Sequence, residues 1–269
     1  MNKHLFDLTG EVAAVVGGAG ALAGAVAEGF STAGARVAVL DRNAEKGEEQ
    51  AAAIRSAGGQ AKFYAIDALD RGSVDAARDA IEQDLGPVSI LFNGAGGIDP
   101  NAVVTPERPL DQMPLEAWDR NFRLNLVGGC LLPCQSFGQT MLEQGRGSVI
   151  NIASVSAHIA LSKVIAYSAA KAGVISLTQF LAREWALRKV RVNSITPGFF
   201  PGEQNRRALF EEDGSLTPRG QQVVAHTPMG RFGDPKELVG VAIFLASQAS
   251  SFVTGTDIRV DGGFLSYTV

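Results

Sequence analysis

The sequence has little cysteine, little histidine and no excess of positive charge. Two cysteines and three histidines occur among 269 residues, and 24 basic residues stand against 28 acidic ones, for a net charge of −4. So few thiols cannot build a disulfide framework or a cysteine-rich metal site, and we expect no bound metal. A nucleic-acid partner is not indicated either, because phosphate binding needs clustered Lys and Arg.

Long apolar runs are absent as well. No stretch approaches the roughly 18 apolar residues of a membrane-spanning helix, and the first residues lack the apolar core of a signal peptide. We therefore expect a cytoplasmic protein with no membrane partner. Hydrophobic residues make up 46% of the chain, which excludes disorder and is consistent with one domain over residues 1–269. The two cysteines, Cys130 and Cys134, lie in an apolar helix-like run and are expected in the core.

Short apolar runs and helical patterns alternate along the chain. Seven runs predict strands, at residues 11–17, 36–40, 62–66, 88–92, 148–152, 190–195 and 257–260. Helical patterns cover 21–33, 43–57, 73–84, 115–144, 164–188 and 235–247. The strands are continuously apolar, which is typical of a parallel sheet with helices on both faces. The order predicts a single doubly wound Rossmann domain of the α/β class.

Two stretches, 95–114 and 198–234, show no regular pattern. Irregular stretches of this length in a compact domain are usually functional. We expect the second stretch to be the substrate loop.

A glycine-rich turn follows the first predicted strand and leads into a helix. It reads Gly17-Gly18-Ala19-Gly20-Ala21-Leu22-Ala23-Gly24. The backbone N–H groups of such a turn, with the positive end of the helix that follows, suit the pyrophosphate of a dinucleotide. A tight turn in any α/β protein looks the same, so the turn alone leaves that alternative open.

Acidic residues follow the next two predicted strands. A carboxylate at Asp41 would accept hydrogen bonds from the adenosine ribose and repel the 2′-phosphate of NADP, which predicts NAD as the cofactor. The alternatives are a helix cap at Asp41 and a phosphate contact from the adjacent Arg42. Asp67, followed by Ala68, would hold the adenine amino group or only close a turn.

Small residues follow the fourth predicted strand, in the order Asn93-Gly94-Ala95-Gly96. They would let the backbone lie against the nucleotide, and the Asn93 amide could tie neighbouring strands together. The alternative is an ordinary Asn-Gly turn.

Tyr167 and Lys171 are four residues apart, on one face of a predicted helix, and Ser154 follows the fifth strand. A free tyrosine has a pKa of about 10, but a nearby ammonium favours the phenolate. Tyr167 would then take the proton of a substrate alcohol while Ser154 orients the same oxygen. Asn125, in the preceding helix, would hold a water beside Lys171. Tyr-x-x-x-Lys also arises by chance in helices; the turn upstream and Ser154 argue against chance here.

Over its whole length the chain resembles the short-chain dehydrogenase/reductase family. The resemblance rests on the Gly17–Ala23 turn, Asp41, Asn93-Gly94-Ala95-Gly96, Asn125, Ser154, Tyr167, Lys171, Pro197-Gly198 and Val260-Asp261-Gly262-Gly263. It implies a catalytic tetrad of Asn125, Ser154, Tyr167 and Lys171, and a homotetramer. It also implies that Gly17, Gly20, Ala21, Leu22, Pro197, Gly198, Phe200, Tyr167 and Lys171 contact NAD.

Four positions depart from the family pattern. Val16 replaces a threonine, and Ala21 and Ala23 replace glycines, which is acceptable only where the backbone φ is negative. Gly202 stands where a threonine often contacts the nicotinamide amide, so that contact would come from backbone or be absent.

The loops resemble the D-mannonate oxidoreductase (fructuronate reductase) branch of the family. The segments that carry this are Lys163, Pro197-Gly198-Phe199-Phe200, Glu203-Gln204-Asn205-Arg206, Asp213-Gly214-Ser215-Leu216-Thr217 and the run from His226 to Gly233. A sugar-acid substrate needs a cation for its carboxylate, and Lys163 and Arg206 are the candidates. Further polar contacts are expected from Ser154, His158, Gln204 and Asn205. The alternatives are a gluconate, polyol or 3-oxoacyl reductase, or a nucleotide-binding regulator without turnover.

Overall fold

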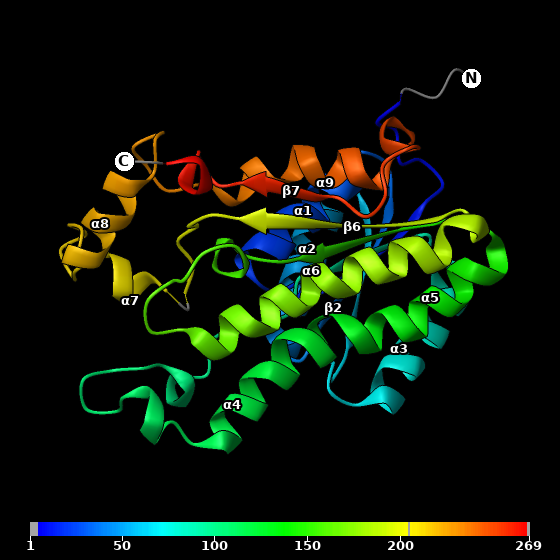
Figure 1. Cartoon of the computed structure of the whole chain (residues 1–269). Helices are drawn as coiled ribbons and strands as arrows, with labels where there is room; N and C mark the ends of the chain where they lie inside the picture. Colours follow the sequence, from blue (N-terminus) through cyan, green and yellow to red (C-terminus); the bar gives the residue numbers. More distant parts are fainter. Residues whose placement is uncertain (1–4, 204, 268–269) are drawn as a thin grey trace.

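A seven-stranded parallel sheet forms the centre of the computed structural model, which describes residues 5–203 and 205–267 (Figure 1). The strands are β1 (Val12–Val16), β2 (Arg36–Asp41), β3 (Gln60–Ala65), β4 (Ile90–Asn93), β5 (Gly147–Ile152), β6 (Val190–Pro197) and β7 (Asp257–Val260). Their spatial order is β3-β2-β1-β4-β5-β6-β7, so the order reverses between β1 and β4. The predicted doubly wound α/β fold is confirmed, and ligands of such sheets bind beyond the carboxyl ends at the reversal.

Helices cover both faces of the sheet (Figure 1). One face packs against α1 (Ala21–Thr32), α2 (Ala44–Ser56) and α9 (Val239–Ala246); the other packs against α3 (Arg71–Asp84), α5 (Leu132–Gln144) and α6 (Ile165–Trp185). Successive residues of β1 alternate between the two cores, with Val15 in one and Val16 in the other. Burial on both faces explains why each strand is a continuous apolar run.

The helix predicted over 115–144 has the predicted bounds, but it is not α-helical throughout. A π-helical segment, Arg123–Leu131, separates α4 (Leu115–Phe122) from α5. A Cβ atom on Gly128 would lie 3.0 Å from the Ala68 carbonyl oxygen, and one on Gly129 would lie 2.6 Å from the Ala95 carbonyl oxygen. The segment therefore packs directly on the loops that end β3 and β4. π turns are rare and frequently mark functional sites.

Residues 198–234, predicted to be irregular, contain α7 (Arg206–Leu209) and α8 (Pro218–His226). Thr217 caps α8, with its Oγ1 accepting a hydrogen bond from the Gly220 N–H at 3.0 Å, and Pro218 begins the helix. Both helices lie at the end of the molecule toward which the arrowheads of β6 and β7 point (Figure 1). That end carries the carboxyl termini of the strands, where the substrate loop was expected.

Cys130 and Cys134 are buried free thiols, as predicted. Within the part of the chain that the structure describes, no helix is long and apolar enough to cross a bilayer.

Candidate functional site

The glycine-rich turn lies directly against the end of β4. Gly17 has φ of +78°, and a Cβ atom there would come within 2.7 Å of the Ala95 backbone nitrogen. Gly20 is the N-cap of α1 and donates its N–H to the Gly17 carbonyl at 2.9 Å. Only glycine fits at position 17, because both the backbone conformation and the close approach exclude a side chain.

The two alanines that replace glycines of the family pattern fit without strain. Ala21 and Ala23 lie in the first turn of α1, and neither is among the non-glycine residues with positive φ. Ala23 is buried beside Gly94, while the neighbouring Leu22 is partly buried against the core of that sheet face. The turn and the amino end of α1 thus keep the shape that a pyrophosphate requires.

Asp41 stands at the carboxyl end of β2 and connects that strand to the turn. Its Oδ2 accepts a hydrogen bond from the Ala19 N–H at 3.2 Å, and its Oδ1 accepts one from the Asn43 N–H at 3.0 Å. Asn43, rather than Asp41, caps α2 through the Lys46 N–H. The carboxylate therefore lies beside the glycine-rich turn, as a ribose-binding group must. Arg42 is exposed beside it.

Two further predicted cofactor residues have structural roles in their side chains. One Asp67 oxygen accepts a hydrogen bond from the Leu69 N–H at 2.9 Å, which closes the turn after β3. Asp67 is exposed, and its second carboxylate oxygen could still accept a hydrogen bond from a ligand. Asn93 is buried, and its Nδ2 donates to Asn151 Oδ1 at 2.8 Å. Asn93 thus ties β4 to β5, and only its backbone and those of Gly94 and Ala95 remain to border a nucleotide.

These observations fit a dinucleotide. A close-packed glycine turn, a helix amino end and a strand-terminal carboxylate converge where the strand order reverses.

Ser154, Tyr167 and Lys171 come together beside this turn. The Ser154 hydroxyl lies close enough to the Tyr167 hydroxyl to act on its pKa. The Lys171 Nζ lies 5.6 Å from the centre of the Tyr167 ring and donates to the Ile152 carbonyl at 2.8 Å. Burial raises the pKa of Tyr167, and the Ser154 hydroxyl lowers it. Burial lowers the pKa of Lys171 to about 8, with the Cys130 thiol acting in the opposite direction.

Asn125 belongs to the π-helical segment and fastens it to the loop after β4. Its Oδ1 accepts the Gly97 N–H at 3.0 Å, and its Nδ2 donates to the Gly97 carbonyl at 2.7 Å and to the Asn121 carbonyl at 2.9 Å. A Cβ atom on Gly96 would lie 2.7 Å from Asn125 Oδ1 and 3.4 Å from Lys171 Nζ. Asn125 and Lys171 therefore meet at Gly96, and Lys171 in turn lies beside the Tyr167 ring. The amide nitrogen is already engaged, so a water beside Lys171 would have to bind Oδ1.

Three residues predicted to contact substrate or cofactor have other partners in the structure. The His158 Nε2 lies 3.1 Å from Asp257 Oδ2, at the amino end of β7, and 3.2 Å from Thr196 Oγ1. Both ends of the Asn205 amide close the loop on itself, through the Gly202 N–H and the Phe200 carbonyl. The Phe200 side chain is buried in the core, so only its backbone could touch a cofactor.

Gly198 and Gly202 lie where the predicted substrate loop passes close to other parts of the site. Gly198, after Pro197, donates its N–H to the Val260 carbonyl at 2.9 Å, and a Cβ atom there would lie 2.7 Å from the Asp261 Cα. At Gly202 a Cβ atom would lie 3.8 Å from that of Ala21, so the loop passes over the glycine-rich turn. Gln204 lies outside the described residues.

The two candidate cations for a carboxylate differ in their surroundings. Lys163 is exposed, has φ of +75° and accepts the Val104 N–H at its carbonyl at 2.8 Å. A positive φ at a non-glycine residue is a strained conformation that clusters at functional sites. Arg206 is exposed and its guanidinium lies 5.1 Å from the centre of the Phe210 ring.

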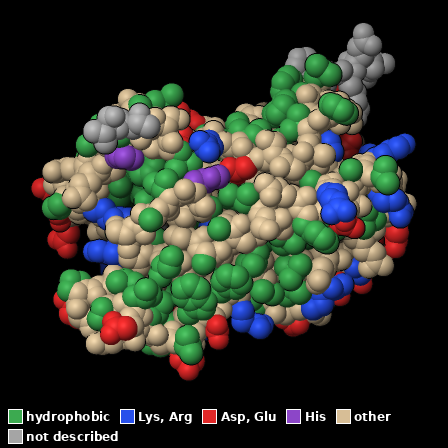
Figure 2. All heavy atoms as spheres, in the orientation of Figure 1, with side chains coloured by type: hydrophobic (Ala, Val, Ile, Leu, Met, Phe, Trp, Pro, Cys, Tyr) green, Lys and Arg blue, Asp and Glu red, His purple; other side chains and the backbone are tan. Residues whose placement is uncertain are grey.

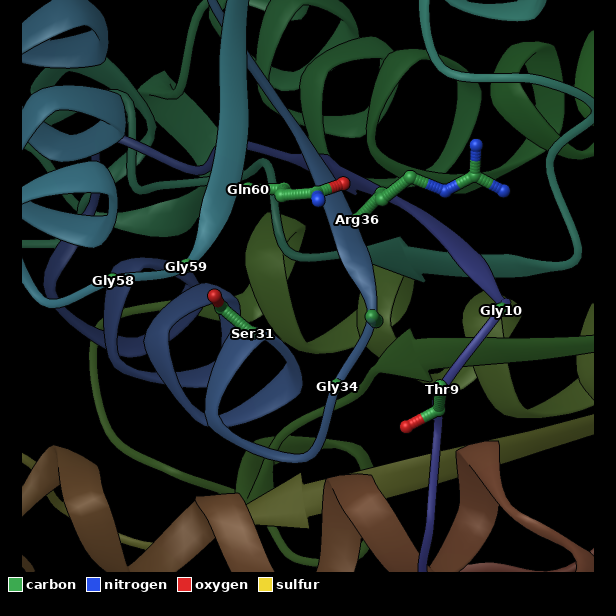
Figure 3. A pocket seen from close by; sticks show the side chains of 9 residues that line it. Thr9, Gly10, Ser31, Gly34, Arg36, Gly58, Gly59 and Gln60 are labelled. Atoms are coloured by element: carbon green, nitrogen blue, oxygen red, sulfur yellow. The ribbon is translucent and has the colours of Figure 1, made fainter.

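A separate hollow lies at the opposite end of the sheet. Figure 3 shows Thr9, Gly10, Arg36 and Gln60 around it, residues that precede or begin β1, β2 and β3. It borders the amino ends of the strands, so it is not the site at which doubly wound sheets bind their ligands.

Comparison with known proteins agrees with this geometry. The profile of the family described as Enoyl-(Acyl carrier protein) reductase matches residues 17–265. The chain belongs to the short-chain dehydrogenase/reductase family. It is thus an oxidoreductase of CH–OH groups that uses a nicotinamide cofactor.

Several similar proteins carry the names of enzymes for polyhydroxy compounds. The D-threitol dehydrogenase of Mycolicibacterium smegmatis is 39% identical over 96% of this chain and 94% of its own. A structure described as a D-mannonate oxidoreductase from Haemophilus influenza, with bound NAD, is 35% identical over 97% of each chain, with a TM-score of 0.91. A gluconate 5-dehydrogenase from Burkholderia cenocepacia, with NADP and tartrate, is 33% identical over 98% of each chain, with a TM-score of 0.87.

Proposed function

We propose that the protein is an NAD-dependent oxidoreductase that interconverts a secondary alcohol and a ketone on a sugar acid, with D-mannonate and D-fructuronate as the first pair to test. The observation that carries the proposal is the buried Lys171 ammonium beside the Tyr167 ring, with the Ser154 hydroxyl close enough to lower the pKa of Tyr167. A scaffold without turnover has no need of this arrangement.

Each residue of the tetrad has its own role in the proposed reaction. Ser154 holds the substrate oxygen, and Tyr167 accepts the proton from that oxygen. The positive charge of Lys171 favours the phenolate form of Tyr167. Asn125 keeps the loop after β4 beside Lys171, where a water on its Oδ1 would carry the proton outward. The glycine-rich turn and Asp41 would hold the nicotinamide cofactor, which would supply the acceptor for the hydride that leaves the substrate carbon.

A substrate panel tests the function. The purified protein should reduce NAD when a hexonate is the substrate. The reaction is monitored through the absorbance of the reduced cofactor. The panel should hold D-mannonate, D-gluconate and the hexitols of equal length, because relatives include a D-threitol dehydrogenase and a gluconate 5-dehydrogenase. A stronger response to hexitols would favour a polyol dehydrogenase. No turnover with any alcohol would favour a nucleotide-binding regulator.

The choice of NAD rests on Asp41, since similar structures hold either NAD or NADP. Changing Asp41 to Asn should reduce the ratio of kcat/KM for NAD over NADP by about tenfold or more, because a carboxylate near the 2′-phosphate repels it by a few kcal/mol (about 4 kcal/mol per unit charge at about 4 Å). Asparagine retains one acceptor for the Ala19 or Asn43 N–H.

Asp67→Asn is the matched control for Asp41. Asp67 also stands at a strand end, but it is proposed to bind the adenine, which the two cofactors share. Its change should alter kcat/KM for both cofactors by the same factor. A wild-type enzyme that prefers NADP would show that Asp41 does not select the cofactor.

We also propose a homotetramer. Leu115 of α4 and Phe180 of α6 expose 75% and 57% of their surface, and apolar side chains gather on the face of the molecule shown in Figure 2. Contiguous apolar surface of this kind marks contact sites. Light scattering on the eluting protein should give four times the mass of 28.2 kDa.

A further inference from the structure

A third cation, Arg219, lies at the same end of the molecule as Lys163 and Arg206. It belongs to the first turn of α8, directly after the Thr217 cap and Pro218. Its Nη1 donates to the Ser162 Oγ at 3.4 Å, which is long for a hydrogen bond. Ser162 precedes Lys163 and stands five residues before Tyr167. Arg219 therefore bridges from the substrate loop to the segment that enters α6.

Three segments meet at this point. The Lys163 carbonyl accepts the Val104 N–H, which joins the loop after β4, and the Ser162 hydroxyl accepts from Arg219, which joins α8. Figure 1 shows α8 at the end where α6 begins, and Figure 2 shows a notch there with Lys or Arg side chains along its rim. The guanidinium thus lies beside the segment that leads into α6, at a residue five positions before Tyr167.

The charge of Arg219 lacks an anionic partner. Among the described residues it forms no ion pair, and Ser162 is a neutral acceptor. The residue is half-buried, unlike the exposed Lys163 and Arg206. Holding a charge partly out of water is costly unless an opposite charge joins it.

The acidic residues of the same loop have other partners or are exposed to solvent. Glu203 pairs with Lys46 of α2 at 2.6 Å, and one Asp213 oxygen accepts from the Ser215 hydroxyl at 2.6 Å. Glu211 and Glu212 are exposed at the surface beyond α7. No described carboxylate forms an ion pair with Arg219, so its charge is open to a bound anion.

We infer that Arg219 binds the carboxylate of the substrate and is the main determinant of the preference for sugar acids over neutral polyols. The inference rests on the proposed function, because it concerns the substrate of that same site. A planar guanidinium can bind both oxygens of a carboxylate at once, which a lysine cannot do. Ser162 holds the guanidinium in place until the acid arrives.

The test compares Arg219→Gln with the wild-type protein on one hexonate and on the hexitol of equal length. The substitution should raise KM for the hexonate roughly 10- to 100-fold, the effect of a lost charge-assisted hydrogen bond. The KM for the hexitol should change less than about threefold, because a neutral alcohol offers no charge to lose. The KM of Arg219→Lys for the hexonate should fall between the values of the wild type and of Arg219→Gln. Calorimetry of hexonate binding to the complex with reduced cofactor should show the same loss.

Arg207→Gln is the control, since Arg207 is an exposed cation of the same loop with no ion pair among the described residues. It should leave both KM values unchanged. An unaltered Kd for the reduced cofactor would show that Arg219→Gln is folded. If the wild type prefers the hexonate and Arg219→Gln retains that preference, the role of Arg219 is disproved while the sugar-acid function stands. If the wild type prefers hexitols, both the sugar-acid function and the role of Arg219 are disproved.

Discussion

Replacing Tyr167 with phenylalanine is expected to lower kcat by roughly 100- to 10,000-fold, the usual contribution of a positioned proton acceptor. The change removes one oxygen, so the ring still packs beside Lys171. The Kd for NAD, measured by calorimetry, should therefore change little. Loss of both activity and cofactor binding would show that the substitution disturbs the fold rather than the chemistry.

Tyr64→Phe provides the matched control for Tyr167. Its hydroxyl donates to Asp84 at 3.0 Å at the edge of β3, and burial followed by that carboxylate raises its pKa. The same oxygen is lost, but far along the sheet from Ser154. This variant should retain wild-type kcat, and activity of Tyr167→Phe close to that value would exclude Tyr167 as the base.

The second large effect concerns Lys171, whose replacement with methionine should lower kcat by on the order of 100-fold and raise KM for NAD. The ammonium supports the Tyr167 phenolate and, in the proposed complex, also reaches the ribose hydroxyls. Methionine preserves the length of the side chain but carries no charge. Unchanged KM for NAD with reduced kcat would limit Lys171 to the proton transfer.

Lys171 should also make the free energy of unfolding depend on pH. Burial lowers its pKa from 10.5 to about 8 in the folded state. Between these two values the unfolded chain binds the proton and the folded chain does not, so the free energy of unfolding rises with pH across this window. At about 1.4 kcal/mol per pH unit, the wild type should gain about 3 kcal/mol over Lys171→Met by pH 10.5.

Urea denaturation at several pH values between 7 and 10.5 measures this difference. Lys236→Met, at an exposed position, serves as the control and should follow the wild-type slope. A wild-type slope equal to that of Lys171→Met would mean that Lys171 is not desolvated.

The sheet was predictable because burial on both faces makes each strand apolar, and the strand bounds agree to within about two residues. α8 was missed because a nine-residue helix with Gly220 and two valines has weak helical periodicity. Its signal was Thr217 before Pro218, a capping residue followed by the favoured first position. Recognising that pair would have placed Arg219 on a helix.

Side-chain direction was the least predictable feature of the site. Tyr167 and Lys171 lie on one helix face because helical spacing places them there, so sequence spacing was sufficient. His158 turns toward Asp257, which lies 99 residues further along the chain. Asn205 turns back on its own loop. No local sequence pattern indicates either partner, so the sequence could not predict these hydrogen bonds.

The site depends on the number of residues in the π-helical segment, and not only on which residues they are. A π turn accommodates more residues than an α turn, so loss of a single residue from Arg123–Leu131 would let the chain run as one regular α-helix from Leu115 to Gln144. Such a deletion rotates one half by about 100° relative to the other and swings Asn125 away from Gly97. The resulting protein would have a more regular helix and an unassembled tetrad, so single-residue deletions here separate folding from catalysis.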